Sequence, residues 1–161
     1  MSNKSRKTLS KRHINKGRIK KGSKISPSIN AALPAEFHKM SEYTFEELCC
    51  QLMDAEKDIR TADLYGTKGQ SQFGIDILAN RMDQGIEVGQ AKCVTAFSKS
   101  KIKLAANAFL DHWESHWKDK EVKRFVLFVA CSLTTTSQQN EINKWIVEFK
   151  KLDIVFEAWS P

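Results

Sequence analysis

Apolar residues recur at helical spacing in three segments of the chain. Spacings of three and four residues predict helices over about residues 42–57, about residues 98–118, and after the polar loop 132–137. Ser41 or Thr44 can cap the first helix, and the loop hydroxyls can cap the third. The predicted buried faces of the helices are, in chain order, Phe45, Leu48, Cys49 and Leu52; Ile102, Ala106, Phe109, Trp113 and Trp117; and Ile142, Trp145, Ile146 and Phe149.

Five other segments have strand-like patterns. The run Arg124–Cys131 is continuously apolar, which is typical of a central strand buried on both faces. The other predicted strands are 58–64, 75–80, 86–94 and 154–159, with turn residues at 82–85 joining the second and third. The resulting order, α-β-β-β-α-β-α-β, predicts an α/β fold in which a mixed sheet carries helices on its faces.

Length and composition restrict the class of protein. The chain has 161 residues, of which 41% are hydrophobic, so it fits one domain with a real core. No apolar run approaches the ~20 residues of a membrane span, and the basic N-terminus lacks the apolar region of a secretory signal. The four cysteines show no C-x-x-C spacing, which favours reduced, buried thiols in a cytoplasmic protein over a disulfide framework or a zinc cluster.

The positive charge is concentrated at the N-terminus. Residues 1–30 hold ten of the 26 Lys and Arg residues and no acid, so the other 131 residues, with 16 basic and 19 acidic side chains, carry a net charge of −3. We expect residues 1–34 to be a disordered basic tail that binds polyanions without sequence preference. A solubilising arm, a nuclear-import signal and a linker are the alternatives. The folded domain is predicted to span residues 35–161.

Polar side chains interrupt the third predicted strand on one face. Alternation places Val88, Gln90 and Lys92 on the same side, and hairpin pairing brings Asp76 beside them. Carboxylate, amide and backbone carbonyl oxygens are hard donors suited to Mg²⁺, and a neighbouring lysine can orient a water molecule. Such a site could attack a phosphodiester. The alternative is a solvated face of a half-exposed strand.

Three motifs in order carry a resemblance to a known family. They are Phe45-Glu46-Glu47-Leu48-Cys49, the glycine-punctuated segment from Tyr65 to Ile77, and Gln90-Ala91-Lys92-Cys93. Together they resemble the PD-(D/E)XK nuclease superfamily, and within it the Mrr-like restriction endonucleases. The resemblance extends over about residues 40–160 and implies a restriction-endonuclease-like core.

The resemblance also implies roles for individual residues. Asp76 matches the metal-binding aspartate, Lys92 the catalytic lysine, and Gln90 the position where most members have Asp or Glu. The Ala91 carbonyl would complete the shell of a Mg²⁺ ion, for which Mn²⁺ would substitute. The family's helical glutamate maps to Glu46 or Glu47; Glu46 borders the apolar stripe, so we expect it to face the site.

The implied activity is metal-dependent cleavage of double-stranded DNA, in restriction or anti-phage defence. Such domains are often coupled to a sensor or NTPase module, and a nuclease this small would need a homodimer to cut both strands. The alternatives are a non-catalytic DNA- or protein-binding module on the same fold, and a structure-selective nuclease acting on junctions or RNA.

Other polar residues have weaker functional patterns. Gln70 and Gln72 in the glycine-punctuated loop, and Lys99, Lys101 and Lys103 after the third strand, could contact nucleic acid. The loop lacks the P-loop pattern of nucleotide-hydrolysing proteins. His112 and His116 have the i, i+4 spacing of a helical zinc pair, but no third ligand is evident, which favours an interfacial packing role.

Overall fold

The structure is a computed structural model that describes residues 36–66 and 70–161. The described residues form the predicted order of elements, so the mixed α/β class is confirmed. The tail predicted over residues 1–34, and the predicted start of the domain at residue 35, lie outside them. The helices are α1 (Glu42–Asp54), α2 (Lys99–Leu110) and α3 (Thr136–Lys150), and the strands are β1 (Ile59–Leu64), β2 (Ile77–Arg81), β3 (Ile86–Lys92), β4 (Val122–Val129) and β5 (Val155–Trp159).

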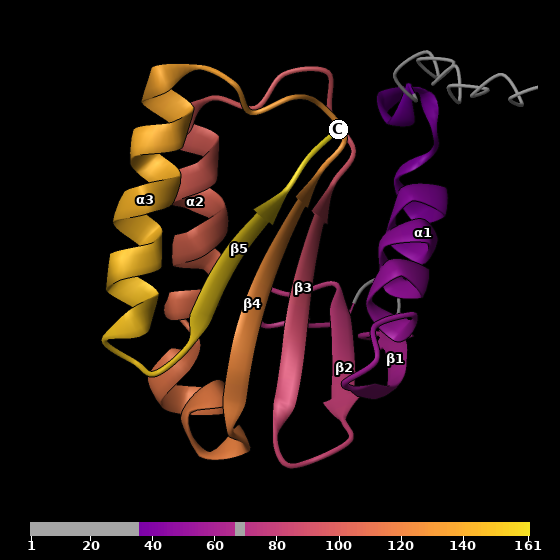
Figure 1. Cartoon of the computed structure of the whole chain (residues 1–161), viewed down its shortest axis with the longest axis vertical. Coiled ribbons are helices and arrows are strands. Elements are labelled where there is room, and N and C mark those ends of the chain that lie inside the picture. The colour runs from indigo at the N-terminus through magenta and orange to yellow at the C-terminus, as the bar shows by residue number, and fades with distance from the viewer. Residues whose placement is uncertain (1–35, 67–69) are drawn as a thin grey trace, which may run out of the picture. The chain divides into compact units, whose positions relative to one another are not determined.

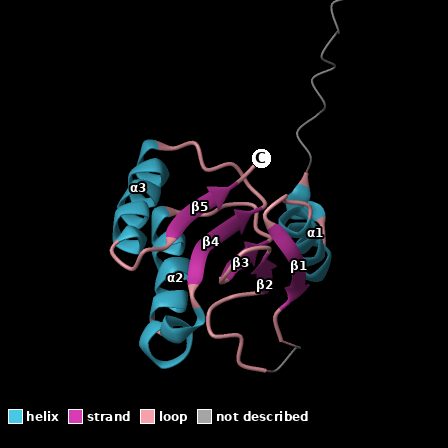
Figure 2. Cartoon of the chain, turned by 60° about the horizontal axis from the view of Figure 1, so that its bottom comes forward, coloured by secondary structure: helices cyan, strands magenta, loops and turns pink. Residues whose placement is uncertain are grey.

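The sheet has the strand order β1-β2-β3-β4-β5. β1, β2 and β3 pair antiparallel, whereas β3, β4 and β5 pair parallel through the crossover helices α2 and α3. Figure 1 shows α2 and α3 together on one side of the sheet and α1 on the other, and Figure 2 shows the same layers after rotation. The sheet is therefore covered on both faces, which explains the continuous apolar run of β4.

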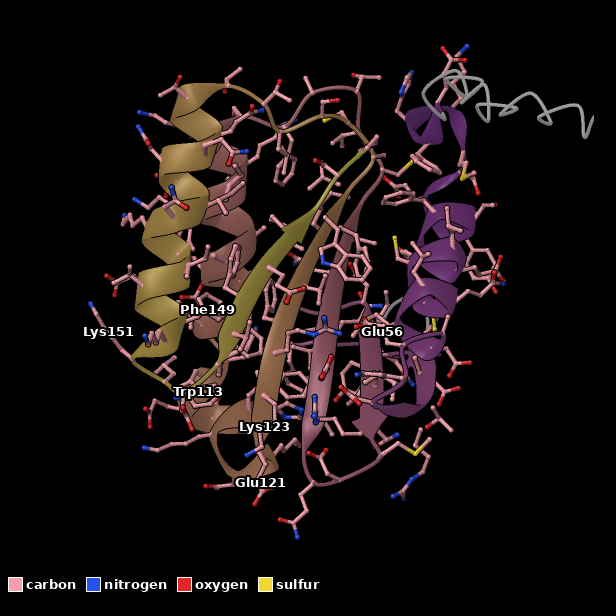
Figure 3. All side chains as sticks on the ribbon, viewed as in Figure 1. Glu56, Trp113, Glu121, Lys123, Phe149 and Lys151 are labelled. Atoms are coloured by element: carbon pink, nitrogen blue, oxygen red, sulfur yellow. The ribbon has the colours of Figure 1, made fainter. Side chains whose placement is uncertain are left out.

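Each face of the sheet has its own apolar core. Phe45, Cys49 and Met53 of α1 pack on one face, and α2 and α3 pack on the other, where Phe149 lies between α3 and the sheet (Figure 3). Two residues predicted to face inward are exposed instead: Leu52 at 44% and Ile146 at 41%. Each lies at the margin of its helix's apolar stripe, which is centred on other residues.

The second predicted helix is shorter than expected. α2 ends at Leu110, and the chain continues as a π-helical turn, η2 (Trp113–Trp117), and a 3₁₀ turn, η3 (Lys118–Lys120). The repeat of four residues from Phe109 to Trp117 drifts around an α-helix of 3.6 residues per turn. The wider π turn, closed by the bond from Trp117 N–H to the His112 carbonyl, offsets this drift and keeps Trp117 fully buried.

The pairing of β2 with β3 determines where the candidate site lies. Ile77 pairs with Gly89, so the preceding residue, Asp76, lies beside the carboxyl end of β3, and its N–H donates to the Gly89 carbonyl at 2.8 Å. In the part of the chain that the structure describes, no helix has both the length and the apolar character needed to cross a membrane.

Candidate active site

Asp76 lies at the junction of a tight turn and β2. Its side chain is 12% exposed, and Oδ2 accepts a hydrogen bond from the Ala91 N–H at 2.8 Å. The same oxygen lies 3.7 Å from Nζ of Lys92. The turn packs tightly against α2 at Gly74, where φ is +82° and a Cβ would come within 2.2 Å of the Ala108 carbonyl oxygen, so only glycine fits there.

Gln90 and Lys92 lie on the face of β3 that is turned toward α2. Gln90 is 6% exposed, so the alternative of a solvated strand face is wrong for this residue. Its Oε1 is buried and has no hydrogen-bond partner among the described residues. A buried polar atom left without a partner lowers the free energy of unfolding by about 1–3 kcal/mol. This oxygen is therefore an acceptor that is available to a ligand.

The Ala91 carbonyl points to the side of β3 on which β2 lies. The Lys92 carbonyl accepts from Ala130 N–H at 3.0 Å, and so points toward β4. Successive residues of a strand direct their backbone groups to opposite neighbours, and the Ala91 N–H indeed points to Asp76. The pairing of β2 with β3 ends at Ile77 and Gly89, so the Ala91 carbonyl lies beyond the last paired residues of β2.

Glu46 joins this group from α1. Two features position α1: the side chain of Ser41 accepts a hydrogen bond from the Thr44 N–H and so caps the helix. At Gly89, the absence of a side chain lets Met53 of α1 pack closely on β3. Burial and the nearby charge of Asp76 raise the pKa of Glu46, whereas Lys92 acts in the opposite direction.

The neighbouring glutamate faces elsewhere. Glu47 lies beside Tyr43, where its hydrogen bond raises the pKa of the phenol. Of the two candidate glutamates, Glu46 is therefore the one close to Asp76 and Lys92, as expected. The α1 stripe that Glu46 borders is, however, centred on Phe45, Cys49 and Met53, and not on Leu48 and Leu52.

We call the group formed by these residues the β3-end cluster: Glu46, Asp76, Gln90, Ala91 and Lys92. Nowhere in residues 36–66 and 70–161 are three His, Cys, Asp or Glu side chains grouped so that they could hold a metal ion. The cluster offers a different donor set of two carboxylates, one amide and one backbone carbonyl. All are hard oxygen donors, so the set fits Mg²⁺ with less negative charge than an all-carboxylate site would supply.

Two residues of the cluster, Gln90 and Lys92, line a groove between β3 and α2. The groove has a volume of about 390 Å³ and is lined by Gln90, Lys92 and Lys101, among others. Lys99 lines a neighbouring hydroxyl-rich hollow of about 710 Å³. Of the three lysines predicted to contact nucleic acid, Lys101 is the one that shares the groove with Lys92; Lys103 is exposed and borders neither of these two hollows.

The groove also contains a feature that the sequence pattern missed. Leu104 lines it and is 67% exposed, so the groove presents an apolar side chain beside its lysines. Helical spacing could have predicted this, since Leu104 lies three residues after Lys101 and so on the same side of α2.

The two glutamines of the glycine-punctuated loop differ in position. Gln72 is half-buried, and its amide donates to the Tyr65 carbonyl at 3.1 Å, so it holds the loop together. Gln70 is exposed. Residues 67–69 of the loop lie outside the described residues.

The cysteines and His116 pack against other parts of the protein. All four cysteines are free; Cys49 is buried, while the other three are half-buried rather than fully buried as expected. Burial, with the charge of Asp76, raises the pKa of Cys49 to about 12, so this thiol is neutral and inert at physiological pH. His116 is stacked on Phe73, with ring centroids 3.7 Å apart, as the interfacial packing role predicted.

Comparisons with protein-family models, with curated proteins and with solved structures give no match to this chain. The function of the β3-end cluster must therefore be inferred from the chemistry of its own side chains.

Proposed function

We propose that the domain is a metal-dependent DNA endonuclease of the PD-(D/E)XK type, in its Q-x-K form. One observation carries the proposal: Gln90, whose buried Oε1 has no hydrogen-bond partner among the described residues, lines the same groove as Lys92 and adjoins Ala91, whose N–H binds Asp76. A buried amide oxygen without a partner, on the strand that also holds a lysine and anchors a carboxylate, suits a site that is completed by a cation and a phosphate.

Most residues of the β3-end cluster would hold a metal ion. Asp76, Gln90, Glu46 and the Ala91 carbonyl would hold Mg²⁺, which when bound lowers the pKa of a water molecule and withdraws charge from a phosphodiester. The hydrogen bond from Ala91 N–H fixes Oδ2 of Asp76 in place. The raised pKa of Glu46 supports a cation in this role, since a positive charge between Glu46 and Asp76 would relieve their repulsion.

Lys92 would act on the substrate directly. Its ammonium has three N–H donors, of which the contact with Asp76 at 3.7 Å uses none at hydrogen-bond distance. It can donate to a non-bridging phosphate oxygen, where negative charge develops during cleavage, and orient the attacking water. Lys101, on the other wall of the groove, adds positive charge along the path of a DNA backbone.

A plasmid assay tests this proposal. Supercoiled plasmid DNA is incubated with the purified full-length chain and Mg²⁺, Mn²⁺ or EDTA, and the amounts of nicked and linear DNA are measured. We expect nicking with Mg²⁺ and Mn²⁺ and none with EDTA. Binding of DNA without cleavage under all three conditions would instead favour the non-catalytic module, and cleavage restricted to junctions or RNA would favour a structure-selective nuclease.

A further inference from the structure

The turn that delivers Asp76 is held from the far side by the π-helical turn η2. Phe73 has a φ of 49°, in the left-handed region that a bulky residue rarely adopts. Its carbonyl accepts a hydrogen bond from Nε1 of the fully buried Trp117 at 2.9 Å. Such a conformation persists when its surroundings hold it, so the backbone three residues before Asp76 depends on contacts with η2.

His116 contributes two further contacts to this arrangement. Its ring stacks on that of Phe73, with centroids 3.7 Å apart and planes 12° from parallel. Its Nε2 lies 3.1 Å from the hydroxyl of Tyr65, and the Tyr65 N–H donates to the Asp76 carbonyl at 2.8 Å. His116 therefore touches both chain segments that position Asp76: the turn before it and the end of β1 beside it.

The partners of His116 define its protonation state. Nζ of Lys120 lies 3.2 Å from Nε2 and donates to the His116 carbonyl at 2.7 Å. An ammonium group can only donate, so Nε2 accepts and the ring proton of the neutral histidine lies on Nδ1. Protonation of Nε2 would remove the acceptor and place a second positive charge next to Lys120.

We propose that neutral His116 is a positioning residue that clamps Phe73 and Tyr65 around Asp76, and that its protonation releases the clamp. Its effect on catalysis rests on the proposed nuclease function, whereas its effect on the position of Asp76 does not. His116 belongs to the His112-x-x-x-His116 pair, to which the sequence pattern gave only an interfacial packing role.

The direction of the pH effect follows from the groups around the ring. Among the described residues, the titratable groups that face it are Lys120 from η3, His112 from the start of η2 and Tyr65, which directly follows β1. Burial, followed by the charges of Lys120 and His112, lowers the pKa of His116 below 6.5. Because the folded state resists protonation, the clamp's stabilisation is fully present above the ordinary histidine pKa and is lost as the pH falls through the lower, folded value.

Two protons report on the clamp without any need for catalysis. The Trp117 indole proton reports on the bond to Phe73, and the Ala91 amide proton reports on the bond to Asp76. Their exchange with solvent is measured by NMR in the full-length chain and expressed as protection relative to the intrinsic rate. Between about pH 7.5 and about pH 5, we expect both protections to fall about tenfold or more in the wild-type protein.

The variant His116→Phe keeps the stack on Phe73 but cannot be protonated. Both protections should therefore be the same at the two pH values, and the acid limb of the cleavage profile should move to lower pH. If protection falls equally in wild type and His116→Phe, the clamp is overturned. If both protons follow His116 but the acid limb of cleavage does not move, its role in positioning for catalysis is overturned.

A second pair of variants covers the case in which His116→Phe does not fold. Lys120→Met removes the charge that opposes protonation, so the midpoint of the protection loss should move to higher pH. Lys118→Met is the matched control, because Lys118 pairs with the exposed Glu114 at 2.9 Å. A midpoint unmoved by Lys120→Met would contradict the clamp. Absence of cleavage at every pH, with protections that still follow His116, would refute the nuclease and leave the clamp intact.

Discussion

The two ends of β3 both carry charged side chains, but they are organised in opposite ways. At the start of the strand, Glu87 is 2% exposed and is paired with Arg81 and Arg124. Arg124 also binds Glu56, in the segment between α1 and β1 (Figure 3), and Glu157 of β5. We call these five residues the β3-start network. At the other end, the β3-end cluster leaves an amide oxygen unpartnered and brings two carboxylates close together.

We propose that this difference separates a structural cluster from a functional one. Every carboxylate of the β3-start network has an arginine partner, so its burial is compensated within the chain. In the β3-end cluster, Glu46 and Asp76 share one nearby cation, Lys92, and the pKa of Glu46 is raised by burial and by Asp76. Unsatisfied groups on an otherwise well-packed strand are where a ligand is expected to complete the structure.

The largest expected effect is on catalysis at the β3-end cluster. Asp76→Ala and Lys92→Ala should each reduce plasmid cleavage by about 10³-fold or more, because Asp76 is proposed to hold the ion and Lys92 to contact the reacting phosphate. Thermal unfolding should change little, since neither side chain is part of the apolar cores. Wild-type-like nicking by either variant would remove the site assignment.

The opposite pattern is expected at the β3-start network. Glu87→Gln removes the buried carboxylate that Arg81 and Arg124 share. Because both arginines keep other carboxylate partners, we expect the loss of these charged hydrogen bonds to cost about 1.5–3 kcal/mol. The free energy of unfolding, measured by urea titration, should fall by that amount. Cleavage by the fraction that remains folded should be preserved. A stable variant with lost cleavage would mean that the two ends of β3 do not differ as described.

A smaller contrast is expected within α1. Glu46→Gln should lower cleavage by about tenfold or more relative to Glu47→Gln, because Glu46 faces Asp76 and Lys92 whereas Glu47 faces Tyr43. The two variants make the same chemical change on adjacent residues, so each controls for the other. Equal activities, or the reverse order, would be inconsistent with Glu46 as part of the site.

The smallest expected effect concerns ion affinity. Gln90→Glu adds a charge that the native amide lacks, so the Mg²⁺ concentration for half-maximal cleavage should fall about tenfold, or about 1.4 kcal/mol. Gln84→Glu is the control, since Gln84 is an exposed glutamine in the turn between β2 and β3 and lies outside the β3-end cluster. An unchanged or higher half-saturation point for Gln90→Glu would show that Gln90 is not a ligand.

Local patterns in the sequence were enough to predict the elements and one face of the site. Alternation along β3 correctly placed Gln90 and Lys92 on one groove, and helical geometry correctly placed Glu46, and not Glu47, on the side of α1 nearer Asp76 and Lys92. Whether Glu46 acts in the site stays a prediction. The break of the second helix after Leu110 was not predictable, because Asp111 and His112 are not strong helix breakers and the π turn depends on Trp117 reaching Phe73.

The contrast between the two ends of β3 was also invisible in the sequence. Glu87 and Gln90 are both polar residues on a mostly apolar strand, and what separates them is their partners. Arg81 lies six residues from Glu87, but Arg124 is 37 residues away and meets it across the β3–β4 ladder. Whether a polar residue is satisfied depends on such tertiary contacts, which local periodicity does not specify.

The central claim is that the β3-end cluster is completed by a divalent cation. A calorimetric titration of the full-length chain with Mn²⁺ tests it most directly, with Asp76→Asn as the variant and Asp83→Asn as the control, because Asp83 is an exposed carboxylate already paired with Arg81. We predict saturable binding by the wild-type protein and by Asp83→Asn, and its loss in Asp76→Asn. Equal Mn²⁺ binding by all three proteins, or no binding by the wild type, would contradict the account.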